Sequence, residues 1–164
     1  MRVLVTGAAG FIGAALTETL LARGDQVIGI DNYDPYYDVA LKQARCNRLA
    51  QQGGNRFTFL PVDFADTDAL NAALDTLPFD RIVHLGAQAG VRYSIENPLA
   101  YVRSNLVGHV NMLELARHRG VEHMVYASSS SVYGGNDKLP FSVDDRADHP
   151  VSLYAATKKS DELM

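Results

Sequence analysis

The chain has 164 residues, of which 47% are hydrophobic and 21% charged, the balance of a globular protein of about one domain. Its net charge of −4 argues against a nucleic-acid-binding surface, which would be basic. No segment resembles a membrane span or a signal peptide, and the single cysteine cannot form an internal disulfide, so we expect a cytoplasmic protein.

Short β-branched segments alternate with segments of helical periodicity along the chain. The sequence predicts strands at residues 2–6, 26–30, 56–62, 81–85 and 123–127. It predicts helices at residues 11–23, 39–52, 67–76, 99–119 and 152–164, the last with Ser152 as its N-cap. This alternation predicts an α/β fold, a doubly wound parallel sheet of the Rossmann type. Its ligand crevice would lie at the carboxyl ends of the strands.

The loop after the first strand has the glycine spacing G-x-x-G-x-x-G. Its members are Gly7, Gly10 and Gly13, with Phe11 and Ile12 inside the motif. The first glycine permits a tight turn, the second lets the backbone approach a pyrophosphate, and the third lets the helix pack on the sheet. The helix N-terminus adds free N–H groups and a partial positive charge. Because the motif falls between a strand and a helix, it predicts a dinucleotide site.

An acidic residue, Asp31, ends the second predicted strand. A carboxylate there would bind the adenosine ribose 2′-hydroxyl and repel a 2′-phosphate, which favours NAD over NADP. The neighbouring Asn32 could share the ribose. Asp63 and Phe64 follow the third strand, where the adenine edge would lie and the Phe64 ring could pack on the base. A helix-initiating turn remains the alternative for this pair.

The end of the fourth predicted strand is rich in small residues. Because small side chains would let a cofactor lie against the backbone, we add Leu85 and Ala87 to the cofactor site. Tyr154 and Lys158 are four residues apart on the last predicted helix and so share a face. An ammonium beside a tyrosine stabilises its phenolate, so Tyr154 could act as a general base. A surface helix pair is the alternative reading.

Together these motifs resemble the extended short-chain dehydrogenase/reductase superfamily, and within it the nucleotide-sugar epimerase/dehydratase family. The matching segments are residues 5–13, 31–32, 36–38, 88–94, 128–134 and 149–158. Among these families the chain is most similar to the UDP-glucuronate 4-epimerase group. The resemblance implies an NAD-dependent isomerase that inverts C4 of a UDP-sugar through a 4-keto intermediate, UDP-glucuronate to UDP-galacturonate. UDP-glucose/UDP-galactose epimerisation is the alternative.

The resemblance also implies roles for individual residues. Ser129 would donate a hydrogen bond to substrate, Tyr154 would be the base, and Lys158 its electrostatic partner and a ribose ligand. Asn105 matches a position that contacts the active-site backbone or the cofactor. Dehydratase relatives carry an Asp-Glu pair after the strand-end residue, and decarboxylase relatives typically carry a glutamate in this turn. The serines at positions 130 and 131 therefore favour simple epimerisation.

Members of this family are roughly twice as long, and the last predicted helix stops at Met164 without a cap. We therefore expect residues 1–164 to be an NAD-binding Rossmann domain, incomplete at its C-terminus and lacking the substrate-binding domain. Such a chain should bind NAD but turn over poorly, and a non-catalytic NAD-binding fragment is the competing interpretation. We expect no nucleic acid, membrane or metal among its ligands. A homodimer is implied for full-length relatives.

Overall fold

The computed structural model describes all residues from 1 to 164. The chain forms two compact units. The first unit contains Met1–Gly86 and Asn111–Tyr126, and the second contains Ala87–Val110 and Ala127–Met164. None of the helices combines the length and the apolar character that a membrane crossing requires.

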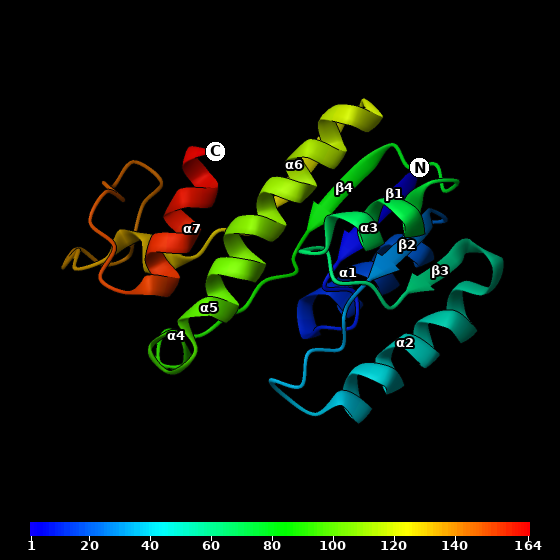
Figure 1. Cartoon of the computed structure of the whole chain (residues 1–164), viewed down its shortest axis with the longest axis horizontal. Helices are drawn as coiled ribbons and strands as arrows, with labels where there is room; N and C mark the ends of the chain where they lie inside the picture. The colour runs from blue at the N-terminus through cyan, green and yellow to red at the C-terminus, as the bar shows by residue number, and fades with distance from the viewer. The chain divides into compact units, whose positions relative to one another are not determined.

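The first unit is built on a parallel sheet of five strands (Figure 1). The strands are β1 (Arg2–Thr6), β2 (Gln26–Ile30), β3 (Phe57–Leu60), β4 (Arg81–His84) and β5 (His123–Tyr126). Their order is β3-β2-β1-β4-β5, so the predicted doubly wound Rossmann-type sheet is confirmed. The direction of winding reverses between β1 and β4, where Val5 is paired with Val83. A ligand crevice is expected beyond the carboxyl ends of these two strands.

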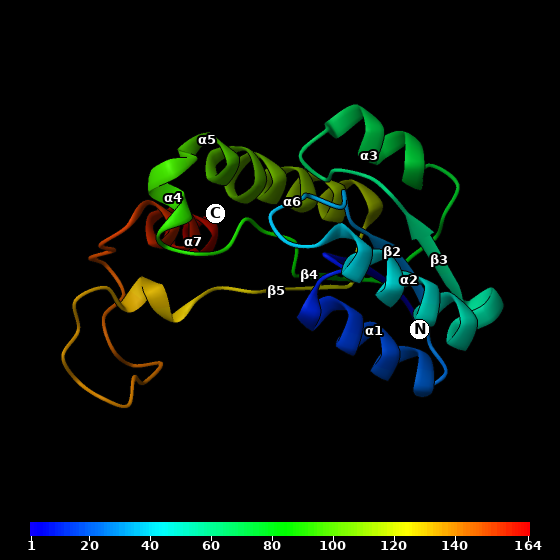
Figure 2. The same ribbon diagram turned by 90° about the horizontal axis from the view of Figure 1, so that it is seen from below.

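Helices cover both faces of this sheet. They are α1 (Phe11–Ala22), α2 (Val39–Gly53) and α3 (Thr67–Leu74), with the later residues of α6 (Gly108–Arg119); the short η1 (Gly54–Arg56) precedes β3. Val3 and Val5 pack with α1 and α2 in one core cluster, whereas Leu4 packs with α3 and α6 in another. This alternation follows from the two-residue period of a strand. Figure 2 shows α1 and α3 on opposite sides of the strands.

The second unit is mostly helical. Its elements are α4 (Tyr93–Glu96), α5 (Pro98–Tyr101), the π-helix η2 (Val102–Val107), the first residues of α6, the 3₁₀ helix η3 (Ser130–Tyr133) and α7 (Leu153–Leu163). The predicted long helix over residues 99–119 is present as the continuous run of α5, η2 and α6, and the π-helical segment inside it was not predicted. Neither α4 nor η3 was predicted. Single π-turns occur frequently at functional sites.

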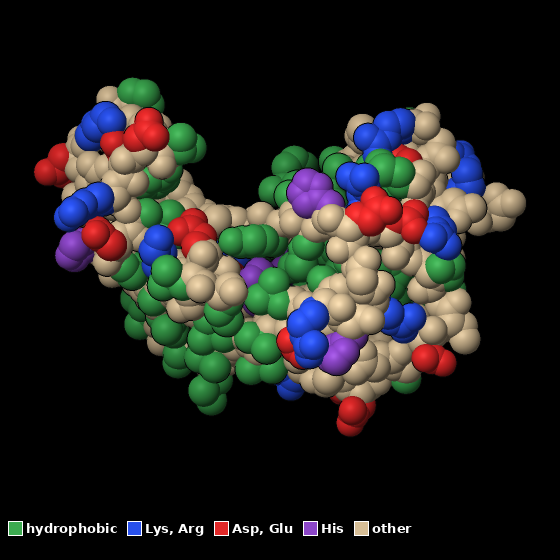
Figure 3. All heavy atoms as spheres, turned by 90° about the horizontal axis from the view of Figure 1, so that it is seen from above, with side chains coloured by type: hydrophobic (Ala, Val, Ile, Leu, Met, Phe, Trp, Pro, Cys, Tyr) green, Lys and Arg blue, Asp and Glu red, His purple; other side chains and the backbone are tan.

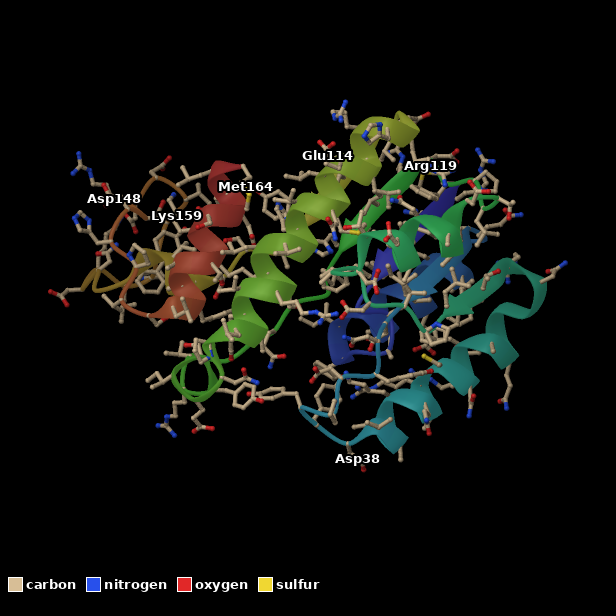
Figure 4. The ribbon with its side chains drawn as sticks, in the orientation of Figure 1. Asp38, Glu114, Arg119, Asp148, Lys159 and Met164 are labelled. Carbon is tan, nitrogen blue, oxygen red and sulfur yellow. The ribbon has the colours of Figure 1, made fainter.

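Side-chain caps begin three of the α-helices. Asp38 accepts a hydrogen bond from the backbone N–H of Ala40 at the start of α2, where Figure 4 labels it. Asp66 caps α3 in the same way. Ser152 Oγ accepts from the N–H of Ala155 at 3.0 Å, which confirms the predicted N-cap of α7.

Candidate functional site

The glycine loop of the first unit is a close-packed backbone cradle. Gly7 has a φ of +67°, and a Cβ built there would lie 2.9 Å from the backbone N of Gly86. A Cβ at Gly13 would lie 2.0 Å from the carbonyl oxygen of Gly7. Thr6 Oγ1 accepts a hydrogen bond from the N–H of Gly86 at 2.9 Å, which ties the end of β1 to the segment after β4. Both glycines are therefore required by contact with neighbouring backbone.

The N-terminus of α1 is left open to an anion. Gly10 is its N-cap, with an extended backbone and no side-chain capping hydrogen bond, and the first turn contains no acid. The side chains of Phe11 and Ile12 are 77% and 66% exposed. The first N–H groups of a helix have no partners within the helix, so this end offers donors and a partial positive charge.

Asp31 lies at the end of β2 and is buried beside the glycine loop. Its Oδ2 accepts a hydrogen bond from the N–H of Ala9 at 3.3 Å, and its Oδ1 accepts from the N–H of Tyr33 at 2.9 Å. The ammonium of Lys42 lies 3.6 Å from Oδ1, and both side chains are buried. A carboxylate has about four lone-pair directions, so Asp31 can still accept from a ribose hydroxyl.

Sequence reasoning missed two cations on α2 that contact this region. Lys42 lies over the ring of Tyr37, 4.7 Å from its centroid. Arg45 donates hydrogen bonds to the carbonyl of Ala9 at 3.3 Å and to the hydroxyl of Tyr37 at 3.2 Å. The three-residue spacing of Lys42 and Arg45 places them on neighbouring positions of one helix face, which is the signal that could have identified them.

The residues predicted near the ribose and the adenine differ in what they can offer. Asn32 is exposed, and its Oδ1 accepts from the N–H of Asp34. Asp63 is half-buried and accepts from the N–H of Ala65. Phe64 is only 7% exposed and packs edge-on against His84 in the core. Its ring therefore has too little free surface to stack on a base, which corrects that part of the prediction.

The chain passes from the first unit to the second shortly after β4, between Gly86 and Ala87. Leu85 follows β4 in the first unit and is half-buried. Ala87 is the first residue of the second unit and is also half-buried. A Cβ at Gly86, between them, would lie 2.5 Å from the ring of Phe64. The small residue predicted at this strand end is thus required by core packing in the first unit.

The predicted base and its partner both lie on α7 in the second unit. Tyr154 is half-buried, and its ring packs edge-on against Tyr101 with centroids 6.0 Å apart. Lys158 is 4% exposed. Its ammonium donates to the carbonyl of Ala127 at 3.1 Å and to Oδ2 of Asp161 at 3.0 Å. Asp161 was not singled out in the sequence.

Ser129 begins η3 in the same unit. It is half-buried, and its Oγ accepts a hydrogen bond from the N–H of Ser131 at 3.1 Å, as the N-cap of this short helix. Because a hydroxyl can accept and donate at once, Ser129 keeps its O–H for another acceptor. Ser128, the preceding residue, is already engaged by Glu162 at 2.5 Å.

Asn105 organises the second unit from inside η2. Its Oδ1 accepts from the N–H of Gln88 at 2.8 Å, and its Nδ2 donates to the carbonyl of Gln88 and to Thr157 Oγ1, both at 3.0 Å. The side chain is 1% exposed. Thr157 precedes Lys158 on α7 and also donates to the carbonyl of Tyr154. Asn105 thus binds both backbone groups of Gln88, and its contact with a cofactor stays a prediction.

Comparison with known proteins places these features in a family. The sequence model described as GDP-mannose 4,6 dehydratase matches residues 4–164. The chain belongs to the GDP-mannose 4,6 dehydratase family. An uncharacterised 37.6 kDa protein of Escherichia coli O111:H- is 55% identical over 164 residues, which are all of this chain and 48% of that protein. The chain spans about half the length of the curated relatives that it matches.

Several relatives of the chain are named as UDP-glucuronate 4-epimerases. A probable UDP-glucuronate 4-epimerase of Rhizobium meliloti is 52% identical over 164 residues, covering all of this chain and 48% of that protein. The crystal structure of UDP-glucuronic acid 4-epimerase from Bacillus cereus, in complex with UDP-glucuronic acid and NAD, is 35% identical with a TM-score of 0.88. The match covers 99% of this chain and 50% of that structure. The predicted resemblance to nucleotide-sugar epimerases is confirmed.

Proposed function

We propose that this chain supplies the NAD site and the proton-transfer residues of a nucleotide-sugar 4-epimerase that interconverts UDP-glucuronate and UDP-galacturonate. The observation that carries the proposal is the second unit's arrangement of Tyr154 and Lys158 on α7, with Ser129 at the start of η3, which contacts α7. A second observation, made in the first unit, supports it: the Gly7–Gly13 loop and Asp31 fit a dinucleotide.

The fit to NAD depends on the backbone of the first unit. The cradle at Gly7 and Gly13 has no room for a Cβ, and the open N-terminus of α1 suits a pyrophosphate. Asp31 offers a carboxylate where an adenosine ribose is expected. NAD held there would accept the hydride of C4 and return it to the sugar. Lys42 limits the discrimination that Asp31 provides, because its ammonium partly neutralises the carboxylate that would repel a 2′-phosphate.

The chain's own residues would handle the proton. Tyr154 would take the proton of the C4 hydroxyl and later return it. The ammonium of Lys158 stabilises a phenolate at Tyr154 and keeps one N–H, beyond its two bonds to Ala127 and Asp161, for a hydroxyl of the bound molecule. Ser129 would donate its O–H to the sugar oxygen at C4.

The residues that follow Ser129 distinguish epimerisation from dehydration. Elimination of water needs an acid and a base beside C5 and C6 of the sugar, in addition to the tyrosine. The two positions after Ser129 in η3 are Ser130 and Ser131, and neither is a carboxylic acid. The family's description names a dehydratase, whereas this turn favours epimerisation. The likeness to the Rhizobium and Bacillus UDP-glucuronate 4-epimerases supports UDP-glucuronate as the substrate.

A chimeric enzyme tests this proposal. The segment of the Rhizobium relative that matches residues 1–164 would be replaced by this chain, and UDP-glucuronate conversion followed by chromatography of the two UDP-uronates. We expect conversion that falls roughly 10²–10⁴-fold in the Tyr154→Phe variant of the same chimera. UDP-glucose should be a poorer substrate. A chimera that folds and binds NAD yet leaves UDP-glucuronate unchanged would contradict the proposal.

The second unit also presents an apolar surface that supports a homodimer. Its exposed hydrophobic side chains include Ile95, Leu99, Val102, Val107, Val110 and Leu163. Figure 3 shows hydrophobic side chains gathered over the helices of this unit. Because contiguous exposed apolar patches mark interaction sites, we propose that two copies associate here. Analytical ultracentrifugation should show a dimer that Val110→Glu dissociates, and a monomeric wild-type chain would refute this assignment.

A further inference from the structure

Three buried titratable side chains occur together in the second unit, and the proposed mechanism uses only one of them. Lys158 is 4% exposed, and Asp161 and His109 are each 1% exposed. Lys158 and Asp161 lie on α7, and His109 lies near the start of α6. Charged groups are rarely buried unless they are paired, because removal from water is costly. The role of the other two groups therefore needs an explanation.

Asp161 is the charged partner of Lys158. The ammonium donates to Asp161 Oδ2 at 3.0 Å, and both side chains are almost fully buried. Its second hydrogen bond goes to the carbonyl of Ala127, which is polar but carries no net charge. Asp161 is thus the only carboxylate that is hydrogen-bonded to this ammonium. The spacings from Tyr154 to Lys158 and from Lys158 to Asp161 place all three residues on one face of α7.

His109 is almost fully buried in the same unit, and the ion pair of Lys158 and Asp161 acts on its pKa. Burial lowers the pKa of His109, the Asp161 carboxylate acts to raise it, and the Lys158 ammonium acts to lower it. Burial also raises the pKa of Asp161, against the opposing effects of Lys158 and His109, while Glu162 acts to raise it further. His109 and Asp161 therefore each respond to the charge of the other and to that of Lys158, and Glu162 is the remaining acid near Asp161.

We propose that Asp161 is a positioning residue for Lys158, holding its ammonium buried on the Tyr154 face of α7, with His109 as the third member of the cluster. The inference rests on the proposed function, which gives Lys158 its role. Without the carboxylate, the ammonium would keep only the Ala127 carbonyl in a buried setting. It would then leave the Tyr154 face for water, since no other acid bonds to it.

Histidine NMR on this chain tests the cluster without any requirement for activity. Asp161→Asn should lower the pKa of His109 further, because the raising effect of the lost carboxylate is larger than the lowering effect of the ammonium that leaves with it. Lys158→Met should raise it, because the opposing ammonium is gone. Opposite shifts support the cluster, and an unchanged His109 titration in both variants overturns it. If Asp161→Asn fails to fold, the direction of the shift in Lys158→Met decides alone.

Glu162→Gln is the matched control for the charge change. Glu162 follows Asp161 on α7 and pairs with Lys159, labelled in Figure 4, at 3.1 Å. It is one residue from Asp161, and its loss removes the same charge from the same helix. Because it bonds to Lys159 and not to Lys158, this variant should leave the His109 titration much closer to that of the wild type. A His109 shift as large as that of Asp161→Asn would show a general field effect and overturn the proposal.

A double-mutant cycle on NAD affinity tests whether Asp161 acts through Lys158. Asp161→Asn should weaken NAD binding about tenfold, the value of one charge-assisted hydrogen bond. In a Lys158→Met background the same substitution should have no further effect. Equal weakening in both backgrounds would show a merely structural role and overturn the proposal. If the wild-type chain binds no NAD, the proposed function fails, while the histidine titration still decides on the cluster.

Discussion

The ammonium of Lys42 lies 3.6 Å from the carboxylate of Asp31, and each side chain is only 7% exposed. This buried pair lies directly behind the glycine loop, because Asp31 also accepts a hydrogen bond from the N–H of Ala9. The acid assigned to the adenosine ribose is therefore a structural residue as well as a candidate ligand. Experiments that replace Asp31 must therefore distinguish the loss of a ribose ligand from the loss of fold stability.

The Lys42→Met variant should destabilise the first unit by about 3–5 kcal/mol, because it leaves a buried carboxylate without its cation. Urea unfolding followed by circular dichroism measures this loss. The double variant Asp31→Asn, Lys42→Met should recover much of it, since no unpaired charge remains. If the double variant is less stable than Lys42→Met, the pair is not the source of the effect.

Gly13→Ala should abolish NAD binding and destabilise the first unit by about 1–3 kcal/mol or more, because its Cβ would lie 2.0 Å from the carbonyl of Gly7. Calorimetric titration and thermal unfolding measure the two effects. Gly135→Ala is the control, since no atom lies within 4 Å of the Cβ position there. A stable Gly13→Ala variant that binds NAD normally would disprove the cradle.

The sequence predicted the sheet well because each strand carries a local signal. Arg2–Thr6 and Gln26–Ile30 were placed at their observed bounds, since β-branched residues and flanking glycines delimit them. The π-helix around Asn105 escaped prediction because it depends on tertiary hydrogen bonds to Gln88 and Thr157. Helical periodicity alone cannot distinguish it from an α-helix.

In the candidate site, too, residues with a local sequence signal were predicted and residues that depend on tertiary packing were not. Motif spacing identified Tyr154 and Lys158, whose separation is fixed by one helix. It missed Asp161 and Lys42, because an acid or a lysine on a helix is usually a solvated residue, and only the packing of other elements buries these two. Phe64 was assigned to the adenine from its position, whereas the structure buries its ring in a core cluster, edge-on to His84.

Asn105→Ala should destabilise the chain by about 2–4 kcal/mol, because it removes three buried hydrogen bonds and leaves both backbone groups of Gln88 without this partner. Hydrogen exchange of the α7 amides should rise with it, since Thr157 loses the hydrogen bond that Asn105 donates from η2. Asn97→Ala, at an exposed position that bonds to the Tyr93 hydroxyl, should change stability by less than about 0.5 kcal/mol. Similar losses from both variants would contradict this role.

Acid should destabilise the fold through His109. Burial lowers its pKa from the ordinary value of 6.5. Just below that pH, His109 is therefore protonated in the unfolded chain but still neutral in the folded chain. Stability is thus lost as the pH falls from about 7 toward the lowered pKa, by up to about 1.4 kcal/mol per pH unit. The raised pKa of Asp161 gives the opposite slope, at pH values above the unfolded carboxyl's pKa of 3.8.

Denaturant unfolding of the wild type and His109→Gln between pH 5.5 and 7.5 measures the His109 contribution. The variant should lose stability less steeply on acidification. His123→Gln, at an exposed histidine, is the control for the loss of an imidazole. If His109→Gln and the wild type respond identically to pH, the imidazole is not the group that titrates.

The central claim is that this chain holds NAD on the Gly7–Gly13 loop with Asp31 at the adenosine ribose. Calorimetric titration of the purified chain with NAD and with NADP tests it most directly. We predict one NAD site, about tenfold or more tighter than NADP, and loss of this preference in Asp31→Asn. Absence of NAD binding, or equal affinity of the wild-type chain for both dinucleotides, would contradict the claim.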